Sequence, residues 1–153
     1  RLAVIANPRT VIIRTNALFG PSLGAKTKGG AGNFVDFVLA RAAAGEDLKM
    51  VADERITPTF TEDLAGACAS LIFDDAPAGV YHLTNSGETS WFEIAKKIYE
   101  RAGAKSTVHP ITSEKRSARA RRPKNALLKN TKRPPLPHWE DALGRYKVFP
   151  RTG

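Results

Sequence analysis

Apolar residues form short continuous runs that alternate with stretches of helical spacing. Residues 11–13 are a continuous apolar run, typical of a buried strand in a parallel sheet. Residues 48–51, 79–83 and 107–111 are also expected to be strands, and the run at 107–111 is expected to be the last one. Strands that alternate with helices of about a dozen residues predict an α/β fold with parallel pairing.

The helices are predicted from their start and stop signals. Asn33 can cap a helix that ends at Gly45, and Thr61 opens a second helix with acidic residues in its first turn. A capping box at residues 90–93 starts a third helix that ends at Gly103, and residues 139–146 offer a short fourth. The expected apolar faces are Phe34, Phe37, Val38 and Leu39 in the first helix, Leu64, Cys68, Leu71 and Ile72 in the second, and Ile94, Ala95, Ile98 and Ala102 in the third.

Proline and glycine mark the connections between these elements. Asn7 and Pro8 are expected to end the tail of a helix, and residues 57–59 are expected to form a turn. Residues 21–32 are rich in glycine and lysine, which favours a surface connection over an active-site lid. The chain begins with Arg1 and its one methionine, Met50, lies far inside, so we expect a piece of a longer protein.

The composition is that of a globular protein with a single domain. The 153 residues are 42% hydrophobic and 25% charged, and no apolar run approaches the ~20 residues of a membrane helix. We therefore expect no membrane association. Cys68 is the one cysteine, which rules out an internal disulfide and favours a reducing, cytoplasmic compartment. Its position on a helical face favours a role in core packing.

The charge excess is concentrated in one segment. Residues 115–133 contain nine of the 24 Lys and Arg residues and no acid, which accounts for the net charge of +9. Arg121 and Arg122 precede a proline, and two guanidinium forks held in a rigid turn suit a diphosphate. A solvated basic loop is the alternative from composition alone. The lack of an interleaved aromatic residue in this segment argues against nucleic-acid binding.

No complete catalytic constellation is present. The glycine spacing gives neither a dinucleotide fingerprint nor a P-loop, and no nucleophile elbow occurs. His82, His109 and His138 are too scattered for a metal motif, and His82 is expected to be a core imidazole. The amides that begin the helix after Asn33 are a second natural anion site.

Eight short motifs occur in order from about Thr10 to Tyr146. They are Arg14-Thr15-x-x-x-Phe19-Gly20, Asn33-Phe34-Val35, Pro58-Thr59 with Asp63-Leu64-Ala65, Gly79-x-Tyr81-His82-Leu83, Ser86-Gly87-Glu88-x-Ser90-Trp91, Arg121-Arg122-Pro123-x-Asn125, Leu128-x-x-Thr131-Lys132 and Leu136-Pro137-x-Trp139. Each is weak alone, but together they resemble the C-terminal half of the dTDP-4-dehydrorhamnose reductases, extended short-chain dehydrogenases that use NADPH or NADH.

The resemblance implies a partial Rossmann-like fold with a small α/β substrate-binding domain. Residues 1–32 would hold a late Rossmann strand and loop, 33–146 the substrate-binding region with returning Rossmann elements, and 147–153 a tail. Thr15 would contact both the nicotinamide and the sugar. The remaining residues expected at the nucleotide sugar are Ala17, Asn33, Arg121, Arg122 and Asn125.

The implied reaction is hydride transfer to the C4 ketone of a dTDP-deoxysugar, giving dTDP-L-rhamnose, with Mg2+ kept as a candidate ion. The family's catalytic Tyr-x-x-x-Lys is absent, because Tyr81, Tyr99 and Tyr146 are each followed four positions later by a residue other than lysine. We expect that motif, and the glycine-rich cofactor site, upstream of Arg1. The chain alone is therefore predicted to be inactive. Without its other half it should be oligomeric or strand-exchanged.

The chain departs from the family at several positions. Ala17 stands where the family commonly has a sugar-stacking Trp, and Phe19 stands where Tyr is common. Glu54, Ile56 and Lys129 replace Gln, Gly and Asp, and Lys129 has no explanation from the sequence. A different nucleotide sugar therefore stays open. So does a non-catalytic module like the regulatory subunit of methionine adenosyltransferase. Lys115, Arg116 and Arg119 are expected to be a solvated approach to the diphosphate.

Overall fold

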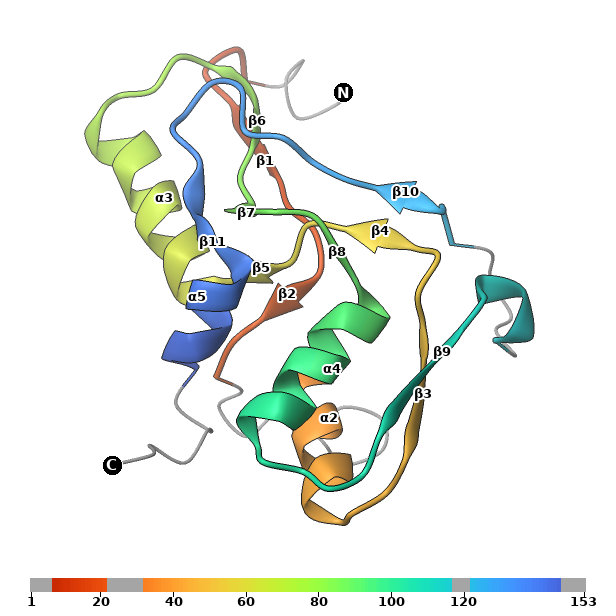
Figure 1. Ribbon diagram of the computed structural model, residues 1–153. Helices are drawn as coiled ribbons and strands as arrows, with labels where there is room; N and C mark the ends of the chain where they lie inside the picture. The colour runs from red at the N-terminus through yellow and green to blue at the C-terminus, as the bar shows by residue number, and fades with distance from the viewer. Residues whose placement is uncertain (1–6, 22–31, 117–121, 147–153) are drawn as a thin grey trace.

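The computed structural model describes residues 7–21, 32–116 and 122–146, and it has an α/β architecture with mostly parallel strand pairs. β1 (Val11–Arg14) pairs in parallel with β6 (Gly79–His82), with Val11 opposite Gly79. Helix α3 (Thr61–Phe73) packs on this pair through Leu71, which meets Tyr81 and Leu83. The predicted α/β class with parallel pairing is confirmed (Figure 1).

A second parallel pair lies at the other end of the molecule. β3 (Leu48–Val51) pairs with β9 (Val108–Ile111), and α4 (Trp91–Arg101) packs against both strands. α2 (Phe34–Ala43) packs against α4 in turn (Figure 1).

Short strands join the two ends. β2 (Leu18–Phe19) pairs with β5 (Thr59–Phe60), and β7 (Asn85–Ser86) pairs with β11 (Leu136–His138). β4 (Arg55–Ile56) lies between β10 (Asn125–Ala126) and β8 (Thr89–Ser90). A 3-10 turn, η1 (Ser113–Lys115), follows β9, and α5 (Trp139–Arg145) is the last described helix.

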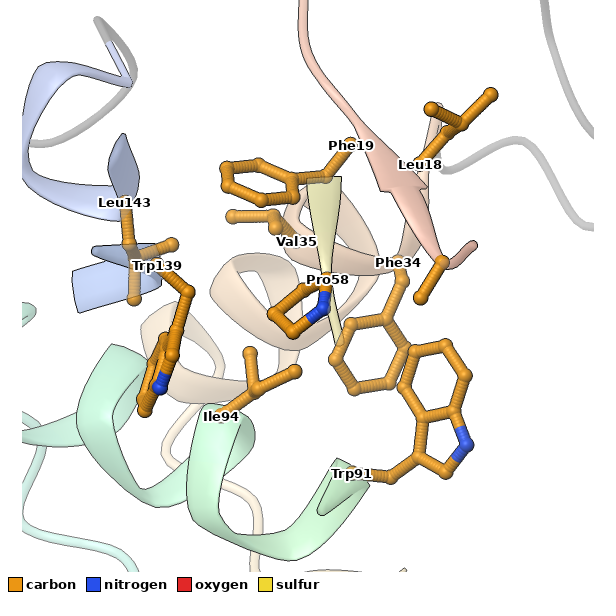
Figure 2. Close-up of a pocket in the computed structure, with 10 residues that line it drawn as sticks. Leu18, Phe19, Phe34, Val35, Pro58, Trp91, Ile94, Trp139 and Leu143 are labelled. Carbon is orange, nitrogen blue, oxygen red and sulfur yellow. The ribbon is translucent and has the colours of Figure 1, made fainter. Parts of the chain in front are cut away.

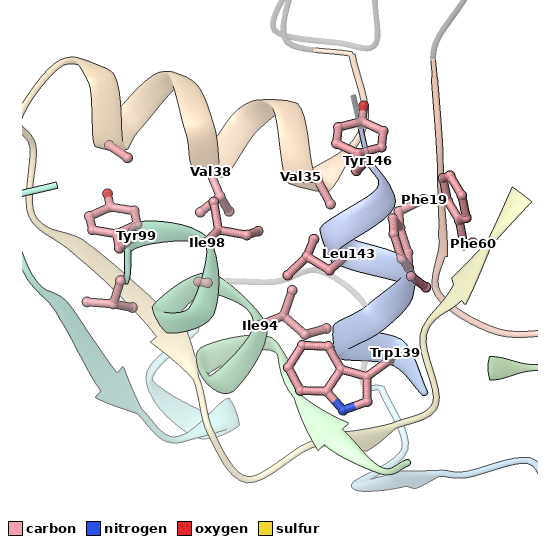
Figure 3. Packing of buried hydrophobic residues seen from close by; sticks show 14 of the residues in the cluster. Phe19, Val35, Val38, Phe60, Ile94, Ile98, Tyr99, Trp139, Leu143 and Tyr146 are labelled. Carbon is pink, nitrogen blue, oxygen red and sulfur yellow. The ribbon is translucent and has the colours of Figure 1, made fainter. Parts of the chain in front are cut away.

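The main core lies between α2, α4 and α5. Helix α5 contributes Trp139 and Leu143, and Tyr146 follows directly after it (Figure 3). Phe19 and Phe60 stack with ring centroids 5.3 Å apart, and Tyr146 meets both rings edge-on. Aromatic residues from three distant parts of the sequence therefore close one side of this core.

The helix starts agree closely with the sequence. Asn33 and Ser90 cap α2 and α4, each in a complete capping box, and Gly45 and Gly103 follow the helices with positive φ. The turn at Asn7 and Pro8 is confirmed by a hydrogen bond from the Thr10 amide to the Asn7 carbonyl. The tail of helix expected before it lies outside the described residues.

Several burial predictions are wrong. β1 is only partly covered, since Ile13 is 37% exposed, and Ile72 of α3 is 77% exposed. On α2 the fully buried residues include Val35 and Ala42, which the predicted face omits. The packing role expected for Cys68 is confirmed in part, because the half-buried side chain packs against the cluster of Leu71, Tyr81 and Leu83 and also lines an open groove.

Two predictions of irregular structure, and one of strand order, are also wrong. Residues 57–59 are buried, and β5 begins at Thr59, while β2 lies within the loop expected after β1. β9 is followed by β10 and β11, so it is not the last strand. Two-residue strands carry too little periodicity to be recognised in a sequence. No described helix is long and apolar enough to cross a membrane.

Candidate functional site

The candidate site begins at the carboxyl ends of β1 and β6. Residues 15–17 leave β1, and residues 126–130 cross the ends of both strands as a strap. The strap is held by a hydrogen bond from the Asn16 side-chain amide to the Ala126 carbonyl, and by one from the Leu128 amide to Thr57 Oγ1 at 3.2 Å. Ligands of open α/β folds bind beyond the carboxyl ends of the strands. This edge is therefore the natural place for a substrate.

Asn130 fixes the far end of the strap. Its side chain accepts a hydrogen bond from the Thr84 amide at 3.1 Å and donates one to the Thr84 carbonyl at 3.2 Å. The side-chain amide thus pairs with the backbone of the chain beyond β6, as a neighbouring strand would. The strap is anchored at both ends, which leaves its intervening side chains in a defined place.

Thr15 and Ala17 are both tied to Thr59, at the start of β5. Thr15 Oγ1 donates to Thr59 Oγ1 at 3.2 Å, and the Ala17 carbonyl accepts from the Thr59 amide at 3.2 Å. Ala17 has a φ of +43°, which is uncommon for a residue with a side chain and costs of order 1–3 kcal/mol. The structure holds this segment in one conformation.

Ala17 lines an apolar pocket (Figure 2). Phe34 and Trp91 lie next to one another in it, with ring centroids 4.7 Å apart and an angle of 63° between their planes. The free space measures about 10 Å3, which is roughly one water-sized sphere. The other lining residues are Leu18, Phe19, Val35, Pro58, Ile94, Trp139 and Leu143.

Asn33 is fully engaged by the chain itself. Its Oδ1 accepts from the amides of Val35 and Asp36, and its Nδ2 donates to the Gly20 carbonyl at 2.6 Å and to the Tyr146 hydroxyl at 2.8 Å. The Tyr146 hydroxyl also donates to Asp36 Oδ1 at 2.6 Å. Burial, and then the carboxylate of Asp36, raise the pKa of Tyr146 to about 12. The first turn of α2 is thus already capped, and a ligand role for Asn33 stays a prediction.

Arg122 and Asn125 lie in the segment that leads into the strap. Both are exposed, and Asn125 pairs with Arg55 across β10 and β4. The Asn125 side-chain carbonyl accepts from the Leu127 amide at 3.0 Å, which shapes the turn into the strap. Arg121 lies outside the described residues. The structure therefore gathers Thr15, Ala17 and Asn125 near the strap, and leaves the arginine pair only partly described.

The basic segment does not form one solvated patch. Arg116 makes a bidentate ion pair with Glu54, at 2.9 and 2.8 Å, and Glu54 is only 2% exposed. The expectation that Arg116 belongs to a solvated approach is therefore wrong. Its Nε is buried without a hydrogen-bond partner. Glu54 had stood out only as a departure from the family, and its partner is 62 residues away in the sequence.

Other basic side chains of residues 115–133 also have partners within the chain. Arg133 pairs with Asp74 at 2.7 Å, and Lys124 lies 3.8 Å from Asp53. The Lys132 ammonium sits 5.0 Å from the centre of the Tyr81 ring. These contacts fasten the segment to three different parts of the fold. Arg119 lies outside the described residues, and Lys129 lines an open groove beside the strap, which does not explain it.

The parallel strand pairs and the carboxyl edge of β1 and β6 define an α/β fold of the kind that binds ligands at this edge. Residues 2–147 match the family described as the RmlD substrate binding domain, and the chain belongs to that family.

Named relatives agree with this assignment. The chain is 34% identical over 143 residues to the spore coat polysaccharide biosynthesis protein SpsK of Bacillus subtilis, covering 90% of this chain and 46% of that protein. It is 34% identical over 142 residues to a dTDP-4-dehydrorhamnose reductase of Streptomyces griseus, covering 86% of this chain and 44% of the relative. The chain thus spans about half the length of these curated relatives.

Solved structures show the same fold. The dTDP-4-dehydrorhamnose reductase of Bacillus anthracis, in complex with NADP, superposes with a TM-score of 0.78 at 33% identity, covering 89% of this chain and 47% of that one. The Clostridium acetobutylicum enzyme of the same name superposes with a TM-score of 0.80 at 31% identity, covering 92% and 48%. The resemblance stated from the motifs is confirmed.

Proposed function

We propose that the chain is the substrate-binding half of an NAD(P)H-dependent nucleotide-sugar reductase, most like dTDP-4-dehydrorhamnose reductase. The observation that carries the proposal is the family match over residues 2–147, since relatives at 34% and 31% identity bear that enzyme name. The anchored carboxyl edge of β1 and β6 supports it, because this is where such folds hold their ligands.

The chain's own residues would bind and orient the substrate. Arg121 and Arg122 would take the diphosphate, because guanidinium forks match phosphate oxygens, with Asn125 beside them. Thr15 and Ala17 would lie along the sugar, and Asn33 would shape the wall of the site through its contacts with Gly20 and Tyr146. Their shared task is to place the C4 ketone in one orientation.

The cofactor would be held mainly by the other half of the parent protein. Thr15 is the residue of this chain assigned to it, and its half-buried hydroxyl at the carboxyl edge fits a place beside the nicotinamide. When bound, the nicotinamide would supply the hydride for reduction of the C4 ketone. The proton on the product oxygen would come from a tyrosine of the other half. Mg2+ stays a candidate ion for the joined protein, and the described residues of this chain include no group of three or more His, Cys, Asp or Glu side chains able to hold a metal.

The preceding half of the parent protein would dock on β1. Within the described part of the chain, β1 pairs with β6 alone, which leaves its other edge open. An open groove of about 520 Å3 runs beside this edge, lined by Val11, Ile13 and Leu71 among others. Ile72 and Phe73 of α3 are 77% and 87% exposed nearby. An unpaired strand edge next to exposed apolar side chains is the surface on which a larger sheet would continue.

The test joins the chain to the upstream half of its parent protein. We expect NADPH oxidation with a dTDP-4-keto-6-deoxysugar, and none from the 153-residue chain alone. The double variant Arg121→Ala with Arg122→Ala should raise KM about tenfold or more, because two charge-assisted contacts are lost. Arg133→Ala is the matched control, since Arg133 is paired with Asp74 away from the site. Absence of turnover with every nucleotide sugar tried would overturn the proposal.

A non-catalytic nucleotide-sugar-binding module is the second candidate. The observation that favours it is Ala17, which supplies no aromatic ring at the position where the family commonly stacks on the sugar. A joined protein that binds dTDP-sugars tightly but never oxidises NADPH would support this reading. An upstream half that contains Tyr-x-x-x-Lys would count against it.

A further inference from the structure

Asn16 lies between the two residues that are proposed to lie along the sugar, Thr15 and Ala17. Both of these neighbours are tied to Thr59, through the Thr15 hydroxyl and the Ala17 carbonyl. The half-buried Asn16 side chain instead donates a hydrogen bond to the carbonyl of Ala126, which is 110 residues away in the sequence. The segment that leaves β1 therefore divides its contacts between β5 and β10.

The Ala126 carbonyl belongs to the strand that continues the chain from Arg122. In this strand, Asn125 pairs with Arg55 of β4, and the Arg55 amide also donates to the Lys124 carbonyl at 2.8 Å. The backbone that follows Arg122 is thus fastened to β4. A contact made to Ala126 from β1 helps to fix where the residues proposed for the diphosphate lie relative to those proposed for the sugar.

The backbone beside Asn16 is in a conformation that its surroundings must hold. Ala17 has a φ of +43°, and a residue with a side chain stays in this region only where several contacts determine it. The Thr59 amide holds the Ala17 carbonyl at 3.2 Å, and the bond to Ala126 holds the residue before it. Without the Asn16 amide, residues 15–17 could relax, and their place relative to β10 would change.

We propose that Asn16 is a positioning residue that sets the spacing between the two sides of the substrate site. The sugar side is Thr15 and Ala17, and the diphosphate side is Arg122 and Asn125. A nucleotide sugar has to contact both sides at once, whereas dTDP needs only the second. The inference rests on the proposed function, and it adds to it the residue that keeps the two sides at the distance that the substrate requires.

The test uses the chain joined to the upstream half of its parent protein, with a dTDP-4-keto-6-deoxysugar as substrate and dTDP as competitive inhibitor. Asn16→Ala should raise KM about fivefold, because one hydrogen bond is lost, and should change kcat and the inhibition constant of dTDP less than twofold. Asn16→Asp should raise KM further, because a carboxylate has no N–H and faces the Ala126 carbonyl. Asn16→Gln keeps a donor on a longer side chain and should recover part of the wild-type KM.

Tyr99→Phe is the matched control for a general loss of stability. The Tyr99 hydroxyl donates to the Glu46 carbonyl at 2.8 Å, so this variant also removes one side-chain donor from a backbone carbonyl, at the end of the molecule around α4 and β3. Thermal melts should show comparable losses for Asn16→Ala and Tyr99→Phe, while the control leaves KM unchanged. If Asn16→Ala does not fold, the difference in KM between Asn16→Gln and Asn16→Asp decides in its place.

The outcomes separate the two proposals. If Asn16→Ala raises KM and the dTDP inhibition constant equally, or changes neither, Asn16 does not set the spacing and the proposed function stands. A fall in kcat at unchanged KM, or an equal rise in KM from Tyr99→Phe, would also overturn the inference, because the effect would then come from the chemical step or from stability. If the wild-type joined protein neither oxidises NADPH nor binds dTDP, the proposed function fails and the inference fails with it.

Discussion

The two ends of the molecule differ in how completely they are covered. Around α2, α4 and α5 the core is closed, with Val38, Ile98 and Ala142 at 0% exposure and two helices held by capping boxes. Around β1, β6 and α3 the buried cluster is only Leu71, Tyr81 and Leu83, and α3 begins without a side-chain cap. The first end is packed internally, whereas the second leaves the apolar side chains of Ile13, Ile72 and Phe73 exposed.

The sharpest test of this contrast replaces one isoleucine from each end. Ile98→Ala should lower the free energy of unfolding by about 2–5 kcal/mol, because it opens a cavity in a fully buried site. Ile72→Ala should change it by no more than about 0.5 kcal/mol in the chain alone, since that side chain is 77% exposed. Urea unfolding measures both. Equal losses would contradict the contrast.

The buried ion pair is expected to be the next most sensitive feature. Glu54→Ala leaves the Arg116 guanidinium without its partner at a largely buried position, which should cost about 3 kcal/mol. Glu54→Gln keeps the shape and one hydrogen-bond acceptor, so its cost should be clearly smaller. The same urea experiment applies. If removing Glu88, whose side chain is 59% exposed, lowers the free energy of unfolding by as much, burial of the Glu54–Arg116 pair does not explain the loss.

The Asp63 carboxylate links the two ends of the molecule, and its protonation makes stability depend on pH. Asp63 of α3 accepts from both Nη atoms of Arg145, at 2.8 and 2.7 Å, and from Asn85 at 2.6 Å. Burial opposes ionisation, but the hydrogen bonds from Arg145 and Asn85 outweigh it and lower the pKa of Asp63 below its ordinary 3.8. The resulting stability is present above pH 3.8 and is lost as the pH falls through the lowered pKa.

Acid unfolding of Asp63→Asn should therefore be less steep than that of the wild type below about pH 4. At neutral pH the variant should be less stable, because the ion pair with Arg145 is gone. Circular dichroism across a pH series measures both effects. Asp141→Asn is the control, as that carboxylate is 63% exposed. If the stability of Asp63→Asn and of the wild type fell identically as the pH was lowered, the pH dependence could not be assigned to Asp63.

The smallest expected effect on stability concerns the open end. Phe73→Ser should change the free energy of unfolding by less than about 0.5 kcal/mol, because Phe73 is 87% exposed. It should nevertheless reduce self-association of the isolated chain, which we predict from its uncovered apolar surface. Light scattering at increasing concentration measures this. A wild-type chain that stays monomeric throughout would count against the prediction.

Local signals in the sequence predicted local structure well. The capping box at Ser90 and Glu93 and the cap at Asn33 are complete within three residues, so they could be recognised without the fold. Periodicity placed Ile72 on the buried face because it identifies apolar positions, not the surface that covers them. In this molecule the described residues form no surface that covers Ile72.

The site was predictable only in part. The motifs marked Thr15, Ala17 and Asn125, which the strap gathers at one edge. The Glu54–Arg116 pair and the contact between Phe34 and Trp91 join residues that are far apart in the sequence and leave no local pattern. The two-fold use of Asn33, as a helix cap and as a donor to Tyr146, likewise depends on a residue 113 positions away.

The hydrogen bond from the Asn33 side-chain amide to the Tyr146 hydroxyl joins residues 113 positions apart, most of the length of the described chain. Aromatic packing of Phe19, Phe60 and Tyr146 depends on the same late residue. During synthesis, the main hydrophobic core therefore stays incomplete until α5 has left the ribosome. Contacts of such long sequence separation make folding slow, and the incompletely folded chain exposes apolar surface of the kind that chaperones bind.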